Sequence, residues 1–305
     1  MGGVVRFFRQ SFFLVVCLFL CTRQSFAQFE IIGAVGTSHF LGDLGGKPLR
    51  GTNDISDLNF ASTRYALLGG FRVFLGDKVA FRTNIAYARI TADDKLTKNV
   101  ERHGRNANFF SPIVEGSAVF ELHFGHNGRS RYDKSGSFYL YGGVGFFYFE
   151  PKGRLNGEVI KLRPLGTEGQ NYRDDIKPYK NTGVNIPFGL GYRFRVGDGY
   201  LGIEVNTRRN FTDYLDDVST VFPDRNKLYT SSGAKALEWV NNTTSTIPGF
   251  DAPGAIRGDP KDKDGYFFIL IKFDYPLRGV MDLGFGSGKR GRGGFRFNKG
   301  KCWEF

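Results

Sequence analysis

The sequence has few stretches rich in alanine and leucine, and its only long uninterrupted apolar run lies near the N-terminus. The first shortage argues against an all-α protein, because such stretches are typical of helices. The second excludes a membrane protein built of several spanning helices, since each needs about 20 consecutive apolar residues. The chain is not disordered either, because 41% hydrophobic and 16% aromatic residues are ample for burial or lipid contact.

Residues 1–27 have the pattern of a secretory signal peptide. Two arginines precede an apolar run over residues 11–21, and Ser25 and Ala27 are the small residues before the expected cleavage site. The run is too short for a spanning anchor. Cleavage would leave Cys302 as the single cysteine, and an odd cysteine in an exported protein predicts a free thiol or a disulfide to another chain.

Several segments of the mature chain alternate apolar and polar residues with a period of 2, the pattern of a half-buried strand. The clearest runs from Val184 to Val196, with Asn185, Arg193 and Arg195 on its polar face. The segments are longer than the ~5 to 6 residues of typical soluble strands. We predict eight strands, at residues 29–41, 63–75, 79–88, 110–124, 138–146, 184–196, 200–211 and 265–275.

The connections between these strands alternate between short and long. The long ones span residues 43–62, 93–107, 150–183 and 212–263. This is the pattern of an eight-stranded antiparallel transmembrane β-barrel of the outer membrane, with short periplasmic turns and long extracellular loops. An even strand number places both termini in the periplasm. We therefore expect an all-β barrel over residues 28–275 that contacts outer-membrane lipids.

The polar faces of the strands are expected to point into the barrel, because Arg or Lys at the lipid midplane costs ~2 to 4 kcal/mol. Eight strands enclose only enough space for side chains, so we expect no open pore. The predicted interior charges are Arg82, Glu115, Glu121, Arg193, Arg195, Glu204 and Lys272.

Residues 276–305 are expected to form a glycine-rich, basic periplasmic tail rather than a ninth strand. Arginine beside phenylalanine resembles a nucleic-acid-binding segment, but export removes nucleic acid as a partner. Trp and Arg are favoured anchors of protein interfaces, so a protein partner suits the tail better, although a disordered tail with an incidental thiol is also open. The candidate partner-binding residues are Cys302, Trp303, Arg290, Arg292, Arg296, Lys299 and Lys301.

Other candidate motifs are weak. Asp213, Tyr214, Asp216 and Asp217 form an acidic loop motif with no His or Ser nucleophile beside it, which favours loop ordering over acid/base work. The carboxylates at 259, 262 and 264 lack the twelfth-position Glu of a calcium loop, and the histidines at 123 and 126 lack a third ligand. We expect no metal, no cofactor and no catalytic residues.

Taken together, several motifs resemble the PorG-like outer-membrane barrels of Bacteroidota, of which the chain would be a member or close paralogue. They occur in the family's order and span nearly the whole mature chain. The most specific are the acidic motif around Tyr214 and the Ser-Pro-Ile-Val-Glu strand. The matching segments are HFLGDL (39–44), NFFSPIVE (108–115), IPFGLG (186–191), TDYLDDVS (212–219) and DGY (264–266).

The resemblance implies an integral, non-enzymatic component of the type IX secretion system, which exports proteins with a C-terminal signal and is tied to gliding motility in some species. It implies that the barrel anchors or positions a periplasmic ring of a PorK/GldK-like lipoprotein and a PorN/GldN-like protein. On this hypothesis Cys302 is a candidate covalent link to the lipoprotein.

Two other functions are open from the sequence. The first is a surface-binding or adhesive barrel, whose long loops would contact targets through Tyr172, Tyr179, Tyr214, Tyr229 and Trp239. The second is a barrel-embedded hydrolase or acyltransferase, but the sequence has no legible Ser-His pair at useful spacing.

Overall fold

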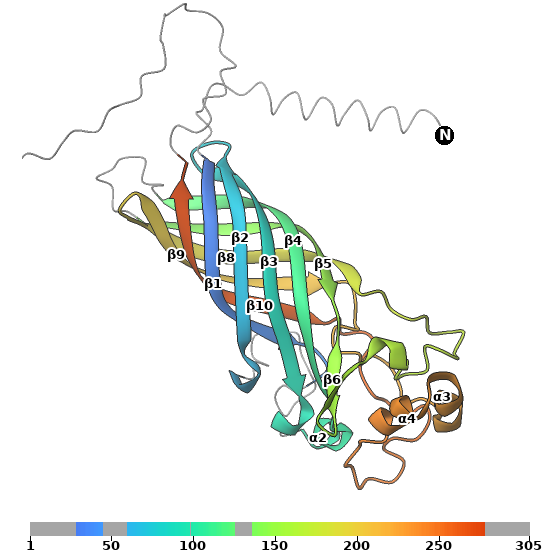
Figure 1. Ribbon diagram of the computed structural model, residues 1–305. Coiled ribbons are helices and arrows are strands. Elements are labelled where there is room, and N and C mark those ends of the chain that lie inside the picture. The colour runs from blue at the N-terminus through green and yellow to red at the C-terminus, as the bar shows by residue number, and fades with distance from the viewer. Residues whose placement is uncertain (1–28, 45–59, 98, 126–135, 278–305) are drawn as a thin grey trace, which may run out of the picture.

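The computed structural model describes residues 29–44, 60–97, 99–125 and 136–277, and it confirms the predicted eight-stranded antiparallel barrel (Figure 1). Each barrel strand pairs with its neighbours in chain order, and β1 pairs with β10 to close the sheet. The strands are β1 (Phe29–Leu41), β2 (Arg64–Phe74), β3 (Val79–Asp93), β4 (Asn108–Gly125), β5 (Ser137–Phe149), β8 (Thr182–Val196), β9 (Gly199–Asn210) and β10 (Gly265–Pro276).

Side chains alternate between the lumen and the outer wall along each strand. The outer wall carries large exposed apolar residues, such as Ile85, Val144 and Phe138, which are 70%, 62% and 61% exposed. An apolar wall around a closed barrel is suited to lipid, because every backbone hydrogen bond is made within the sheet. Across the described ranges, no helix is both long enough and apolar enough to span a membrane.

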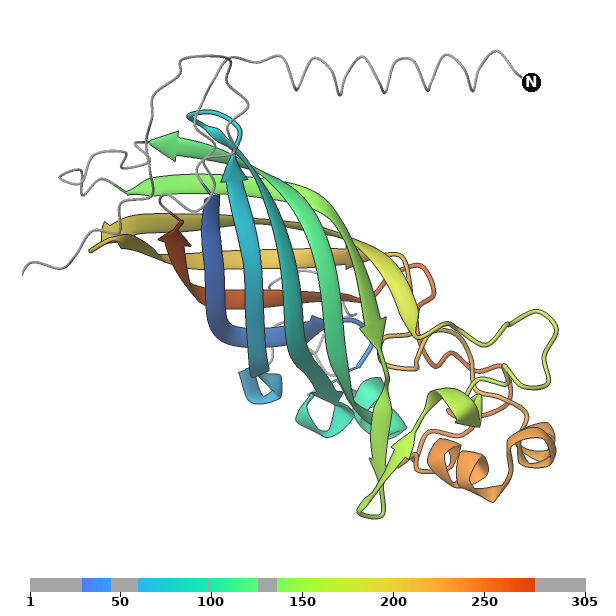
Figure 2. The same cartoon turned by 45° about the horizontal axis from the view of Figure 1, so that its top comes forward.

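Both described ends of the chain leave the barrel at the same end, where the backbone N–H of Leu277 donates to the carbonyl oxygen of Phe29 at 2.8 Å. The tight turns β2–β3 and β8–β9 lie at this end too, and the long connections lie at the other (Figure 2). The predicted signal peptide and nearly all of the predicted tail fall outside the described residues. So do Arg290, Arg292, Arg296, Lys299, Lys301, Cys302 and Trp303.

Residues 150–181 and 211–264, expected as loops, instead fold into a small structured unit, which we call the head. Its apolar residues, among them Leu215, Phe222 and Leu228, belong to one core cluster with Ile113 and other residues of the barrel interior. Burial of these scattered residues explains why segments without a regular sequence period become ordered. The head contains β6 (Lys152–Leu155), β7 (Glu158–Lys161), η4 (Arg163–Leu165), α3 (Arg225–Ser232) and α4 (Ala234–Val240).

Short elements also lie in the other long connections, namely η2 (Phe60–Ser62), η3 (Asp94–Leu96) and α2 (Val100–Arg105). The β6–β7 hairpin continues from β5 and pairs with β4 at Phe110 and Lys152. It packs tightly on α4, because a Cβ atom at Gly153 would lie 2.2 Å from Cη2 of Trp239. Only glycine therefore fits at this position of β6.

Candidate functional site: a filled lumen and a folded head

The structure places all seven predicted interior charges in the buried lumen. Near the end that holds the chain termini, Arg72 lies between three carboxylates. It donates to Glu30 and Asp274 at 2.7 Å and to Glu121 at 2.6 Å. Arg193 also donates to two of these three carboxylates, to Glu30 at 2.7 Å and to Asp274 at 3.2 Å. Charges from five strands are thus paired across the lumen.

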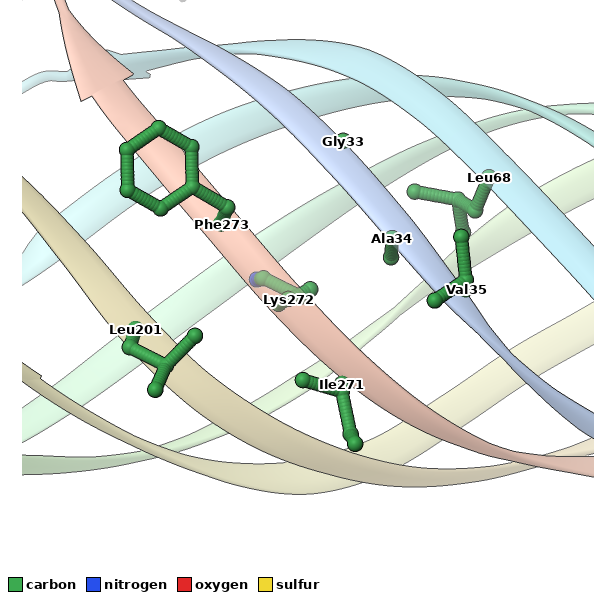
Figure 3. A pocket seen from close by; sticks show the side chains of 8 residues that line it. All are labelled: Gly33, Ala34, Val35, Leu68, Leu201, Ile271, Lys272 and Phe273. Carbon is green, nitrogen blue, oxygen red and sulfur yellow. The ribbon is translucent and has the colours of Figure 1, made fainter.

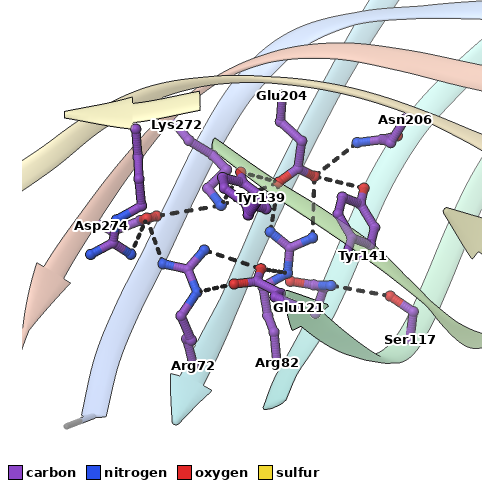
Figure 4. Close-up of polar contacts among 12 residues, drawn as sticks. Arg72, Arg82, Ser117, Glu121, Tyr139, Tyr141, Glu204, Asn206, Lys272 and Asp274 are labelled. Atoms are coloured by element: carbon purple, nitrogen blue, oxygen red, sulfur yellow. Dashed lines mark hydrogen bonds and ion pairs between the residues drawn. The ribbon is translucent and has the colours of Figure 1, made fainter. Parts of the chain in front are cut away.

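Glu204 is the centre of the next layer (Figure 4). Its carboxylate accepts from Arg82 at 2.6 Å and from Lys272 at 3.2 Å. The hydroxyls of Tyr139 and Tyr141 donate to it at 2.7 and 2.8 Å. Two cations and two phenols from three strands therefore share one fully buried carboxylate, and removal of that carboxylate would leave them unpaired.

A third layer surrounds Glu115, closer to the head. Arg208 donates to its carboxylate at 3.0 Å, the hydroxyl of Tyr266 at 2.7 Å and the amide of Asn185 at 3.0 Å. Arg195 lies near the opposite end, where its Nε donates to the carbonyl oxygen of Gly197. The barrel lumen is thus filled by side chains that bind one another across it, as expected for eight strands.

Sequence reasoning missed Glu30, Arg72, Arg208 and Asp274, all of which are buried in these layers. A signal was present for two of them. Asp274 follows Lys272 by two residues in β10, and Arg208 follows Glu204 by four in β9, so each shares a face with a predicted interior charge.

Two sequence motifs resemble metal sites only weakly, the histidines at 123 and 126 and the carboxylates at 259, 262 and 264. His123 lies in the lumen, where its Nε2 is 2.9 Å from Glu121, and position 126 is outside the described residues. Within the ranges that the structure describes, no three His, Cys, Asp or Glu side chains are grouped so that they could hold a metal ion.

The outer wall has a hollow of about 450 Å³ between β1 and β10 (Figure 3). It lies beside Gly33, which has no side chain to fill the wall, and Val35, Leu201, Ile271 and Phe273 line it. These four side chains are apolar and exposed, so the hollow offers lipid contact.

In the head, Glu168 and Asp217 hold the two long connections together. The carboxylate of Glu168 accepts from Arg257 at 3.0 Å and from the backbone N–H of Ser219 at 2.8 Å. Asp217 accepts from the hydroxyls of Thr167 and Tyr179, each at 2.6 Å. These bonds join residues about 40 to 90 positions apart in the sequence, which makes the head a single folded unit.

The predicted acidic loop motif lies at the base of the head. Asp213 accepts from the hydroxyl of Ser219 at 2.7 Å, and Asp216 accepts from the backbone N–H of Val218 at 2.9 Å. Tyr214 stacks on Tyr179 with ring centroids 4.9 Å apart. Each side chain of the motif orders neighbouring loop segments.

Four carboxylates gather here, Asp43, Asp213, Asp216 and Asp264, which we call the acidic cluster. Burial, with repulsion from neighbouring carboxylates, raises the pKa of Asp213 to about 7 and that of Asp43 to about 6. The same two causes raise the pKa values of Asp216 and Asp264. Among the described residues, Oδ1 of Asp213 and Oδ1 of Asp264 have no hydrogen-bond partner. The cluster is therefore prone to hold protons near neutral pH.

Three cations, Arg102, Arg105 and Lys263, face the acidic cluster, and the charges of Arg102 and Arg105 lower the pKa of Asp43. Arg105 is engaged elsewhere, since it donates to Asp94 at 2.7 Å and its other nitrogens bind backbone carbonyl oxygens. The nearby charge of Lys263 lowers the pKa of Asp213, but by less than burial raises it. The cluster therefore keeps its raised pKa values despite these three cations.

The aromatic residues predicted to serve loop binding do not form one surface. Tyr179 and Trp239 are buried in the core, and Tyr172 and Tyr214 are half-buried against it. Tyr229, on α3, is 56% exposed. Four of the five rings therefore pack within the head, and Tyr229 is the one among them that is exposed for contact with a target.

Over residues 9–232 the sequence matches the family described as a domain of unknown function (DUF6089). The chain belongs to this family. The match covers the barrel up to β9 and the first part of the head. No curated protein matches the chain.

Solved barrels with a similar fold include Ail, the attachment invasion locus protein of Yersinia pestis, in a complex with the heparin analogue sucrose octasulfate. It is 10% identical, with a TM-score of 0.35, over 82% of this chain and 99% of that chain. Neisserial surface protein A is 7% identical, with a TM-score of 0.35, over 82% of this chain and 97% of that chain. The N-terminal barrel domain of Pseudomonas aeruginosa OprF is 9% identical, with a TM-score of 0.33, over 82% and 99%.

Proposed function

We propose that the protein is a structural component of the type IX secretion machinery in the outer membrane, where it anchors or positions the periplasmic ring. The filled lumen is the observation that carries a structural role. Arg72, Arg82 and Glu204 bridge strands across the barrel, so the described interior offers neither a wide passage nor a reactive group open to substrate. The link to secretion itself is supported by the sequence resemblance to PorG-like barrels.

The arrangement of the chain ends supports ring contact through the tail. Phe29 and Leu277 lie together at the end with the tight turns, so the tail, which begins at Pro276, leaves the barrel there. In outer-membrane barrels the tight turns face the periplasm. A tail that begins there reaches periplasmic proteins, and a disulfide through Cys302 would hold such a contact without a large interface.

We expect Cys302 to form a disulfide with the ring lipoprotein. The test is to tag the protein in the head, extract envelopes with a thiol-blocking reagent, and compare non-reducing and reducing gels. The account predicts a larger non-reducing band that contains the lipoprotein and disappears in Cys302→Ser. A blocked free thiol, with no ring protein recovered, would overturn the covalent anchor.

A surface-binding module is the second candidate function, and the folded head favours it. The head exposes apolar side chains away from the barrel wall, including Ile256 at 81% and Tyr229 at 56%. Exposed apolar groups on a rigid unit are suited to contact with another macromolecule. This function would need the head and not the tail.

A further inference from the structure

Basic residues gather around Phe110 on the outer wall, where β3 and β4 approach the head. The guanidinium carbon of Arg89 lies 4.3 Å from the centroid of the Phe110 ring, and that of Arg154 lies 5.8 Å from it. Arg89 is in the outward register of β3, two residues beyond the exposed Tyr87. Nε of Arg89 is buried and has no hydrogen-bond partner among the described residues.

The β6–β7 hairpin brings two lysines to the same place. Lys152 pairs with Phe110 in the sheet and with Lys161 across the hairpin. Glu150 is the carboxylate here, 2.9 Å from the amine of Lys152 and 2.7 Å from that of Lys161. Four cations, Arg89, Lys152, Arg154 and Lys161, thus lie together, and Glu150 pairs with the two lysines. We call these four residues the basic patch.

A row of tyrosines fixes the depth of the basic patch relative to lipid. Tyr65, Tyr87 and Tyr148 are 47%, 44% and 43% exposed on adjacent parts of the wall. Tyr87 and Tyr148 each pair with Val114 in the sheet, and the Tyr65 and Tyr87 ring centroids are 6.0 Å apart. Such aromatic belts lie at the boundary between hydrocarbon and lipid headgroups.

Below this row the outward residues are apolar, with Ile85 70% exposed. Above it, Arg89 is about 7 Å further along its strand, because a strand rises ~3.3 Å per residue. The basic patch therefore lies at the depth of the headgroups, and it is continuous with the wall that contacts acyl chains.

We propose that the basic patch binds the headgroup of a lipid that carries two phosphates on an acylated disaccharide, a lipid A-type molecule, in the leaflet on the head side. Arginine pairs with phosphate through two parallel hydrogen bonds, and lysine adds point charges. The four cations outnumber Glu150 and Asp93, the carboxylates beside them on the hairpin and on β3, and this excess of positive charge suits a headgroup with several negative charges. A soluble phosphate would not use the adjoining tyrosines and apolar wall.

The test is native mass spectrometry of the full-length protein in detergent, titrated with bisphosphorylated lipid A. The charge-removed variant is Arg89→Gln/Lys152→Gln, and Lys152→Gln/Lys161→Gln in the hairpin is a second variant should the first fold poorly. The matched control is Lys227→Gln/Lys261→Gln, which removes two exposed lysines of the head away from the patch. Folding of each variant is checked by its heat-dependent gel mobility.

We expect the wild type and the control to bind one lipid A about tenfold more tightly than the charge-removed variants, a difference of about 1.4 kcal/mol. Dephosphorylated lipid A should bind the wild type no better than it binds the variants. Equal binding by wild type and variants, equal binding of phosphatidylglycerol, or competition by inorganic phosphate at millimolar concentration would each overturn the proposal. The readout is lipid binding alone, so the result does not depend on a role in secretion.

Discussion

Replacement of Glu204 by alanine is expected to destabilise the folded barrel by about 3 to 5 kcal/mol, the usual cost of removing one partner from a buried ion pair. Arg82 and Lys272 both donate to this carboxylate in the lumen. Tyr139 and Tyr141 would lose an acceptor as well. All four groups are buried in the folded barrel, so solvent does not relieve the penalty.

The measurement is urea unfolding of the refolded protein in detergent, followed by far-UV circular dichroism and by gel mobility without heating. Glu158→Ala is the matched control, because Glu158 is exposed and its pair with Lys235 at 2.7 Å is on the surface. Such pairs contribute ~0 to 1 kcal/mol. A Glu204→Ala midpoint that matches the Glu158→Ala midpoint would contradict the account of the lumen.

The head is expected to open more readily as pH rises from about 4 to about 7. The ordinary pKa of Asp is 3.8, whereas that of Asp213 is raised to about 7 and that of Asp43 to about 6. At pH values between the ordinary pKa and the raised pKa, the carboxyl groups of Asp213 and Asp43 stay protonated in the folded head and ionise when the head opens. The contribution of these two protonated groups to the stability of the folded head is therefore fully present below about pH 4. It is lost as the pH rises through their pKa values in the folded head.

Hydrogen exchange of residues 211–219, corrected for the intrinsic pH dependence, measures this opening. We expect it to be on the order of a hundredfold more frequent at pH 8 than at pH 5. The pKa of Asp213 is about 7 in the folded head and 3.8 in the open head, so each of the two pH units from 5 to 7 changes the opening equilibrium by about tenfold. Asp213→Asn keeps an acceptor for Ser219 but cannot ionise, so it should reduce the pH dependence. Asp175→Asn, at an exposed position paired with Arg173, should leave it unchanged. Equal pH dependence in both variants would contradict the proposed role of Asp213.

The barrel could be predicted from sequence because its strands repeat a simple physical pattern. The segment predicted at 184–196 is observed as Thr182–Val196, since lipid on one side and a polar lumen on the other force strict alternation. β3 and β4 extend further than predicted, to Asp93 and from Asn108. Burial still alternates at the end of β3, but Arg89 and Asp93 on its outward face are polar, and Ile90 and Ala92 on its inward face are apolar. The sequence pattern of the wall is therefore reversed there.

The head could not be predicted in the same way. Glu168 and Arg257 are 89 positions apart, and neither lies in a regular element. Their contact follows from burial of Leu215, Phe222 and other apolar residues that show no period in the sequence. In the lumen, Arg72 was missed because the adjacent glycines at 69 and 70 hide which face of β2 is polar.

The central claim, that the tail and not the head carries the function, is tested most directly by protein export in cells. One strain would carry a chain that lacks residues 278–305, and another a chain whose residues 150–181 and 211–264 are replaced by short turns. Both barrels must first be shown to fold by heat-dependent gel mobility. The account predicts that export of proteins with the C-terminal secretion signal is lost without the tail and retained without the head. Retained export without the tail, together with loss of surface attachment without the head, would contradict it and establish the surface-binding function instead.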